Sequence, residues 1–174
     1  MTPDEALPRG ENANFPRRLH HQGPQSKSGS VYHIRLRVRC DAPRHLTDPL
    51  LAPRLLEAVQ FYQARGRWDC RVALLMPDHA HALLSFPVQA SMSATIGAWK
   101  SYTARCLGIH WQANYFDHRV RDRHSLAVKS AYILRNSVVK GLCEREADWP
   151  WVWPRSYLEQ PARRSGSTNG STAV

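Results

Sequence analysis

One stretch of the chain decides how it folds: VALLMPDHAHALLSF, residues 72–86. Two apolar runs flank Pro77-Asp78, a dipeptide that is typical of a tight connection. The pattern therefore predicts a hairpin of two buried strands, at residues 69–76 and 79–87. Strands joined in this way pair with each other and lie next to each other in a sheet.

His79 and His81 form the first candidate site in this hairpin. Side chains alternate along a strand, so both imidazoles lie on the same face and can hold a metal ion. The alternative is one histidine that is satisfied in the core and one that is solvated. Apolar flanks weaken this alternative, because both rings would need polar partners on that face. We expect the pair near the centre of the sheet.

The remaining elements are predicted from hydrophobic periodicity. Alternation from Tyr32 to Cys40 predicts a strand at residues 31–40 with one buried face. Apolar residues at helical spacing predict helices at 50–65, 94–107 and 126–140, with Ser93 and Ser125 as N-caps and Gly66, Gly108 and Gly141 as stops. Residues 111–120 are irregular or a short strand, and residues 148–153 form a packed terminal segment. This order predicts an α+β fold, with helices packed against an antiparallel sheet.

Composition narrows the class of protein. The chain has 174 residues and 43% hydrophobic residues, enough for one domain with a core. We assign residues 30–157 to that domain, and read residues 1–29 and 158–174 as a disordered basic N-terminal arm and a disordered C-terminal tail. The sequence has no membrane span or signal peptide, so a cytoplasmic location is expected. Its four cysteines form no C-x-x-C motif, which predicts buried, reduced thiols.

The charge of the chain favours a nucleic-acid partner. Lys and Arg total 24 against 14 Asp and Glu, a formal net charge of +10. Such an excess attracts a polyanion. The candidates for phosphate contacts are Arg35, Arg37, Arg39, Lys100, Arg105, Arg119 and Arg121. For each of them the alternative is a solvated surface charge. Candidates for stacking on bases are Trp99, Tyr102 and Phe116, with core packing as the alternative.

Tyr132 and Asn136 form the second candidate pair. Residues four apart share one helix face, with Cβ atoms about 5–6 Å apart, so a nucleophilic tyrosine could lie beside a third metal ligand. The alternative is a core tyrosine beside a helix-interior asparagine. Asparagine is disfavoured inside helices, which indicates a specific role. Tyr115, outside a clear helix, is the rival nucleophile.

The chain resembles the REP-associated tyrosine transposases, within the His-hydrophobic-His ("HUH") single-strand endonucleases. The ordered landmarks span residues 30–155. They are Val31-Tyr32-His33, Met76-Pro77-Asp78-His79-Ala80-His81, Trp99-Lys100-Ser101, Trp111-Gln112, Phe116-Asp117-His118 with Arg121, Tyr132-Ile133 with Asn136, Gly141-Leu142 and Asp148-Trp149-Pro150.

The resemblance implies a ferredoxin-like, HUH-type sandwich and a site. His79, His81 and Asn136 would bind Mg²⁺ or Mn²⁺, whereas two imidazoles by themselves favour Mn²⁺ or Zn²⁺. Tyr132 would cleave and rejoin single-stranded DNA beside stem-loop repeats through a 5′-phosphotyrosine. The family usually has Asn-Pro where this chain has Asn136-Ser137, so the helix is expected to continue more smoothly.

Three functions remain open at this point. The first is the metal-dependent single-stranded DNA transposase. The second is a domesticated hairpin-binding protein that no longer cleaves. The presence of His79, His81, Tyr132 and Asn136 argues against it, because a protein that only binds DNA does not need this set of residues. The third is a zinc hydrolase that uses the two histidines and an unidentified third ligand, which leaves the net charge of +10 unexplained. The resemblance is compatible with a monomer and with a dimer.

Overall fold

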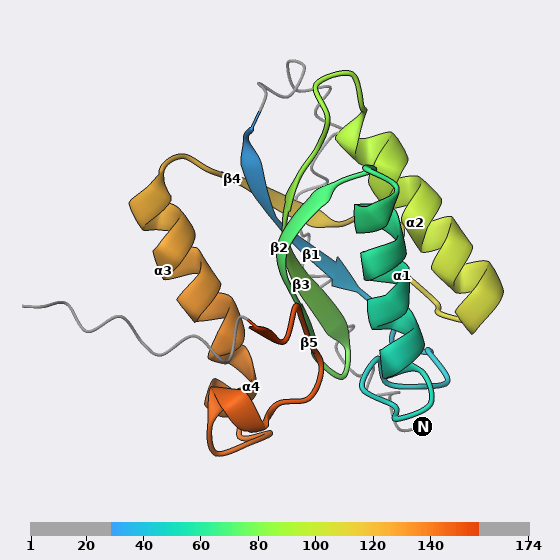
Figure 1. Ribbon diagram of the computed structural model, residues 1–174. Helices are drawn as coiled ribbons and strands as arrows, with labels where there is room; N and C mark the ends of the chain where they lie inside the picture. The colour runs from blue at the N-terminus through green and yellow to red at the C-terminus, as the bar shows by residue number, and fades with distance from the viewer. Residues whose placement is uncertain (1–28, 157–174) are drawn as a thin grey trace, which may run out of the picture.

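The computed structural model describes residues 29–156 as a five-stranded sheet with helices on both faces (Figure 1). The strand order is β4-β1-β3-β2-β5, and every pairing is antiparallel. The strands are β1 Val31–Arg37, β2 Asp69–Leu75, β3 His79–Ser85, β4 Phe116–Val120 and β5 Val152–Trp153. The helices are α1 Ala52–Ala64, α2 Met92–Leu107, α3 Arg123–Leu134 and α4 Asn136–Val139, with a 3₁₀ turn at Glu146–Asp148. The expected α+β fold is confirmed.

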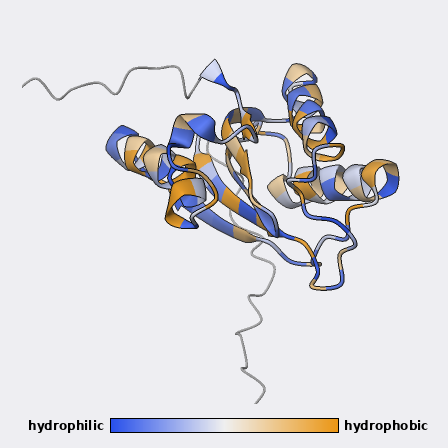
Figure 2. Ribbon diagram, turned by 90° about the horizontal axis from the view of Figure 1, so that it is seen from below, coloured by the Kyte–Doolittle hydropathy of each residue, from blue (hydrophilic) through white to orange (hydrophobic). Residues whose placement is uncertain are grey.

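The sheet separates two apolar cores. Helices α1 and α2 cover one face, and α3 with α4 lies on the other (Figure 1). Side chains alternate along β1, so Ile34 and Leu36 enter the core beneath α1 and α2, while His33 points toward α3. On β3, Leu83 belongs to the core on the α3 side. The same alternation is visible as hydrophobic and hydrophilic bands along the strands (Figure 2).

The β2–β3 hairpin forms as predicted and occupies the middle of the sheet. Met76 N–H donates to the carbonyl of His79 (2.8 Å), which closes the turn. The turn is also held from outside, because Val38 N–H donates to the Asp78 carbonyl (3.0 Å) and Leu46 N–H donates to the Pro77 carbonyl (2.9 Å). Strand β3 pairs with β1 on one side and β2 on the other. Its two histidines therefore lie near the centre of the sheet.

Helix α2 starts earlier than predicted. Its N-cap is Ser91, whose hydroxyl accepts a hydrogen bond from the Ala94 N–H (3.3 Å), so the assignment of Ser93 as the cap was wrong. Ser91 has the extended backbone that an N-cap requires, whereas Ser93 already lies inside the helix. Gly108 ends the helix as expected, in the left-handed conformation.

The third predicted helix, 126–140, was wrong in two respects. Its N-cap is Asp122, whose carboxylate accepts hydrogen bonds from the Ser125 N–H (2.8 Å) and hydroxyl (2.9 Å). Ser125 is thus inside the first turn. The helix is also interrupted at Arg135, which divides it into α3 and α4, and does not continue smoothly into Ser137. Gly141 follows with a positive φ.

The prediction of buried thiols was largely wrong. Among the residues that the structure describes, Cys70 is buried, Cys143 is half-buried, and Cys40 and Cys106 are exposed; all four are free. The expected arm and tail lie outside the described residues, apart from Gly29. Within residues 29–156, no helix has the length and apolarity to cross a membrane.

Candidate active site

His79 and His81 face each other on the α3 side of β3. Their Nε2 atoms lie 3.1 Å apart, with the rings nearly perpendicular at 83°. Two imidazoles that bind one metal at right angles, with bonds of about 2.1 Å, hold their nitrogens about 3.0 Å apart. The pair therefore has the spacing of two adjacent ligands on a single ion.

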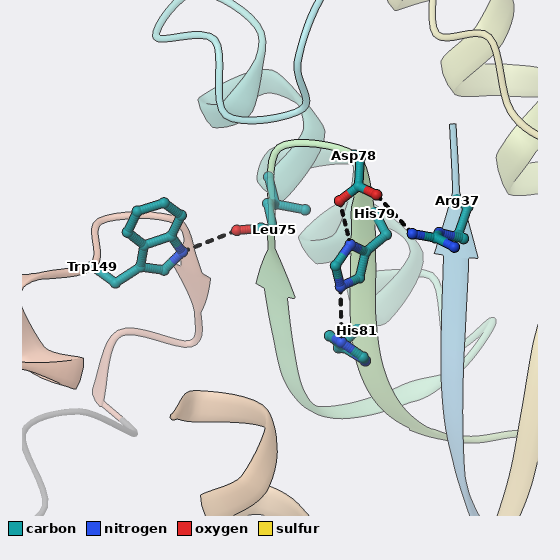
Figure 3. Close-up of polar contacts among 6 residues, drawn as sticks. All are labelled: Arg37, Leu75, Asp78, His79, His81 and Trp149. Carbon is teal, nitrogen blue, oxygen red and sulfur yellow. Dashed lines mark hydrogen bonds and ion pairs between the residues drawn. The ribbon is translucent and has the colours of Figure 1, made fainter. Parts of the chain in front are cut away.

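Asp78 and Arg37 support His79 from the solvent side. The Nδ1 of His79 donates to Oδ1 of Asp78 (2.6 Å), and Nη2 of Arg37 donates to Oδ2 (2.8 Å; Figure 3). Burial alone would raise the pKa of Asp78, but the hydrogen bonds from His79 and Arg37 outweigh it and hold this pKa below its ordinary value. Asp78 is thus an ionised acceptor that orients His79 with Nε2 toward His81.

His33 is the site residue that sequence reasoning missed. Its Nε2 lies 2.9 Å from Nδ1 of His81, and the two rings stack with centroids 5.1 Å apart. The alternation along β1 put His33 on the polar side of the strand, with Arg35 and Arg37, and therefore suggested exposure. The pairing of β1 with β3 brings the two rings together, and α3 packs over His33 through Tyr132. His33 is therefore only 5% exposed, which the pattern of one strand does not reveal.

His33 and His81 are neutral at physiological pH. Burial is the main cause that lowers the pKa of His33 to about 4, and the charges of Lys129 and Arg35, together with His118, contribute to the same shift. Burial lowers the pKa of His81 to about 3, with contributions from the neighbouring His79, His33 and Arg35. A neutral imidazole is the form that binds metals.

Tyr132 reaches the histidines from α3. Its ring centroid lies 6.4 Å from those of both His33 and His81, and the residue is 53% exposed. The nucleophile suggested by the sequence is therefore next to the histidine pair and open to a substrate. Tyr115 packs against the core on the other side of the sheet. Burial and the nearby Asp117 raise the pKa of Tyr115.

Asn136 lies one turn beyond Tyr132, immediately after the interruption between α3 and α4. Its Nδ2 donates to the carbonyls of Tyr132 (2.7 Å) and Ile133 (3.2 Å). The side chain thus takes the place of backbone donors, which explains why the helix breaks here. With Nδ2 bonded to the helix, the amide oxygen is the atom left for a metal. Within residues 29–156, no group of three or more His, Cys, Asp or Glu is arranged to hold a metal ion.

Comparison with known proteins identifies the family. The model of the family "Transposase IS200 like" matches residues 26–136, a range that ends at Asn136 and contains Tyr132 and both histidines of β3. The chain belongs to the IS200-like transposase family. This confirms the resemblance noted from the sequence landmarks.

A solved structure shares the fold of this IS200-like transposase. A REP-associated tyrosine transposase bound to a REP hairpin superposes with a TM-score of 0.66 at 18% identity, over 84% of this chain and 93% of that one. A Deinococcus radiodurans R1 protein described as a transposase gives a TM-score of 0.46 at 19% identity, over 64% and 95% of the two chains. No curated protein matches the sequence.

The predicted DNA contacts of the transposase do not form one surface. Arg35 lies on the histidine face, beside His81 in the strand register, with its guanidinium 5.4 Å from the Phe116 ring centroid. Arg119 and Arg121, together with His118, line an open hollow of about 490 Å³ at the β4 edge. These residues combine exposed positive charge with an aromatic ring, as a nucleic-acid contact requires.

Other candidates have partners within the protein, lie on the opposite face of the sheet or are buried. Arg37 and Arg39 form ion pairs with Asp78 and Asp41. Lys100 donates from Nζ to the carbonyls of Gln112 (2.6 Å) and Ala113 (2.8 Å), and burial lowers its pKa. Arg105 is exposed on α2, across the sheet from Tyr132. Trp99, at 2% exposure, is a core residue that cannot stack on a base.

Proposed function

We propose that the protein is a metal-dependent single-stranded DNA transposase that cleaves and rejoins DNA beside hairpin repeats, with Tyr132 as the nucleophile. One observation carries the proposal. The exposed ring of Tyr132 lies 6.4 Å from the ring of His81, which shares a 3.1 Å Nε2–Nε2 contact with His79. The exposed tyrosine and two imidazole nitrogens with the spacing of metal ligands thus lie next to each other on the α3 face of the sheet.

His79, His81 and the amide oxygen of Asn136 are the residues that would hold the ion. Both imidazoles are anchored through Nδ1, to Asp78 and to His33, which leaves the two Nε2 atoms directed at each other. A bound Mg²⁺ or Mn²⁺ would polarise the scissile phosphate and offset charge that develops on its oxygens. The hard phosphate and amide oxygens, added to two imidazoles, favour these ions over a tightly held Zn²⁺.

The proposed reaction is a transesterification. The Tyr132 hydroxyl oxygen attacks phosphorus and loses its proton, the bond from phosphorus to the 3′ oxygen breaks, and that oxygen takes up a proton. The products are a 5′-phosphotyrosine and a free 3′-hydroxyl. The new ester is of the same type as the one that was broken, so the 3′-hydroxyl of another strand can reverse the step without ATP.

A DNA hairpin is the proposed partner. The net charge of +10 favours a polyanion. The structurally similar REP-associated tyrosine transposase was solved with a REP hairpin. On this chain, Arg35 with Phe116, and the hollow lined by Arg119 and Arg121, supply positive charge on the histidine face and at the adjoining β4 edge. We propose that these residues hold the hairpin and the single strand beside it.

The test uses end-labelled single-stranded hairpins from repeats that flank the gene. They are mixed with the protein and Mg²⁺ or Mn²⁺ and separated on a denaturing gel. We expect an adduct that survives denaturant, requires the ion and disappears in Tyr132→Phe but persists in Tyr115→Phe. The reverse pattern would identify Tyr115 as the nucleophile. Tight hairpin binding without an adduct in any metal would show a binding protein that does not cleave.

A further inference from the structure

We propose that His33 is a positioning residue that hydrogen-bonds to His81 in two alternative tautomers, one in the metal-free site and the other in the metal-loaded site. The inference rests on the proposed metal site and adds to it His33, a buried residue that contacts His81. It starts from a chain of three contacts: Asp78 to His79 (2.6 Å), His79 to His81 (3.1 Å) and His81 to His33 (2.9 Å).

The direction of these hydrogen bonds follows from Asp78. An ionised carboxylate only accepts, so Nδ1 of His79 must carry the proton that it shares with Asp78. When each ring has one proton, Nε2 of His79 is then a lone pair. Without a metal, Nε2 of His81 must donate to it, because two lone pairs would otherwise face each other at 3.1 Å. His81 then accepts at Nδ1, and the donor is Nε2–H of His33.

Metal binding would reverse the direction of the hydrogen bond between His81 and His33. If both Nε2 atoms bind the ion, the proton of His81 moves to Nδ1. The contact with His33 persists only if Nε2 of His33 becomes the acceptor and its own proton moves to Nδ1. Imidazole can make this exchange because either nitrogen can donate or accept. A carboxylate at position 33 could accept from the loaded form but could not donate to the metal-free form.

The position of His33 explains why a neutral group is used there. Asp78 lies at the surface, and Arg37 balances its charge. His33 is buried, and its ring lies 6.4 Å from the ring of Tyr132 and 6.0 Å from that of Phe116. A negative charge at this point would repel the phosphate that Tyr132 is proposed to attack. A neutral partner orients His81 without that repulsion.

The first test measures tautomers by long-range ¹H–¹⁵N NMR of the histidine rings of the wild-type protein at pH 8, without DNA. Without metal, we expect the protons of His33 and His81 on Nε2 and that of His79 on Nδ1. With Zn²⁺ as a diamagnetic probe, the protons of His33 and His81 should both move to Nδ1. A His81 ring that already has its proton on Nδ1 without metal, or keeps it on Nε2 with saturating Zn²⁺, would overturn the inference.

The second test measures Mn²⁺ affinity from the EPR signal of the free ion. His33→Phe should weaken binding by about 10–100-fold, the usual effect of removing a partner of a metal-bound histidine. His33→Gln places an amide that can donate or accept near the same position and should restore most of the affinity. His118→Gln is the matched control, because His118 pairs with His33 in the strand register but is exposed. Wild-type affinity in a folded His33→Phe protein would refute the role.

These measurements separate the inference from the proposed function. The tautomers are read without DNA, so they do not depend on whether Tyr132 is the nucleophile. A DNA adduct that persists in Tyr132→Phe would refute the role of Tyr132 as nucleophile but would not contradict the tautomer exchange at His33. A normal adduct in wild type, with no change of the His81 tautomer on metal binding, would refute the tautomer exchange and leave the proposed function intact.

Discussion

Tyr132 on α3 and His81 on β3 face each other edge to face, with ring centroids 6.4 Å apart and ring planes at 81°. Fifty-one positions of sequence separate them, and the packing of α3 on the histidine face of the sheet brings them together. Tyr132 is exposed and His81 is buried, so the tyrosine is the member of this pair that faces solvent.

Asp78→Asn should weaken the metal site without unfolding the protein. The substitution removes the anionic acceptor that orients His79. We expect cleavage at limiting Mn²⁺ to fall by about tenfold or more and to recover as Mn²⁺ is raised. The matched control is Asp41→Asn, which breaks a similar exposed pair with Arg39 away from the histidines. Equal Mn²⁺ dependence in the two variants would rule out the orienting role.

Asn136→Ala should abolish cleavage and leave hairpin binding nearly unchanged. It removes the proposed ligand oxygen, along with the hydrogen bonds to the Tyr132 and Ile133 carbonyls. Asn136→Asp keeps an oxygen ligand and should restore part of the cleavage at high Mn²⁺. The measurement is adduct yield against Mn²⁺ concentration, with hairpin affinity measured in parallel. Full cleavage by Asn136→Ala at limiting metal would exclude Asn136 as a ligand.

Arg119→Ala and Arg121→Ala should each weaken hairpin binding in a salt-dependent way. Both residues line the hollow at the β4 edge. Loss of one phosphate contact lowers the slope of log affinity against log salt by about one. Binding is measured by fluorescence anisotropy between low and physiological salt. Arg71→Ala is the control, because Arg71 already pairs with Asp69. Unchanged slopes for both variants would place the DNA elsewhere.

Asp122→Ala should lower the thermal stability at neutral pH and have little effect in acid. Hydrogen bonds from the Ser125 backbone and hydroxyl lower the pKa of Asp122. A carboxyl group with a lowered folded-state pKa contributes stability above its unfolded pKa, near 3.8, and loses it as the pH falls through the folded value. Thermal unfolding followed by circular dichroism should show a lower midpoint at pH 7 and converging midpoints at low pH. A constant difference at all pH values would mean that the charged cap does not stabilise α3.

The sequence was informative wherever local pattern decides structure. The hairpin, the shared face of His79 and His81, and the left-handed glycine after α2 follow from alternation and from the conformational range of glycine. The sequence also placed Tyr132 and Asn136 one turn apart. The sequence analysis assigned the wrong N-cap residues to α2 and α3. Ser93 and Ser125 are plausible caps, but Ser91 and Asp122 have the extended backbone that a cap requires.

Only the tertiary structure decided what surrounds the histidines. His33 and His81 are 48 residues apart, and their contact depends on the register of β1 against β3. Periodicity along one strand cannot reveal which end of a polar face a helix will cover, so His33 resembled its exposed arginine neighbours. The same limit explains why Lys100 and Arg37, both cationic in the sequence, are already bound by carbonyls and a carboxylate in the fold. Charge is a property of the residue, whereas its availability to DNA depends on which partners the packed chain places beside it.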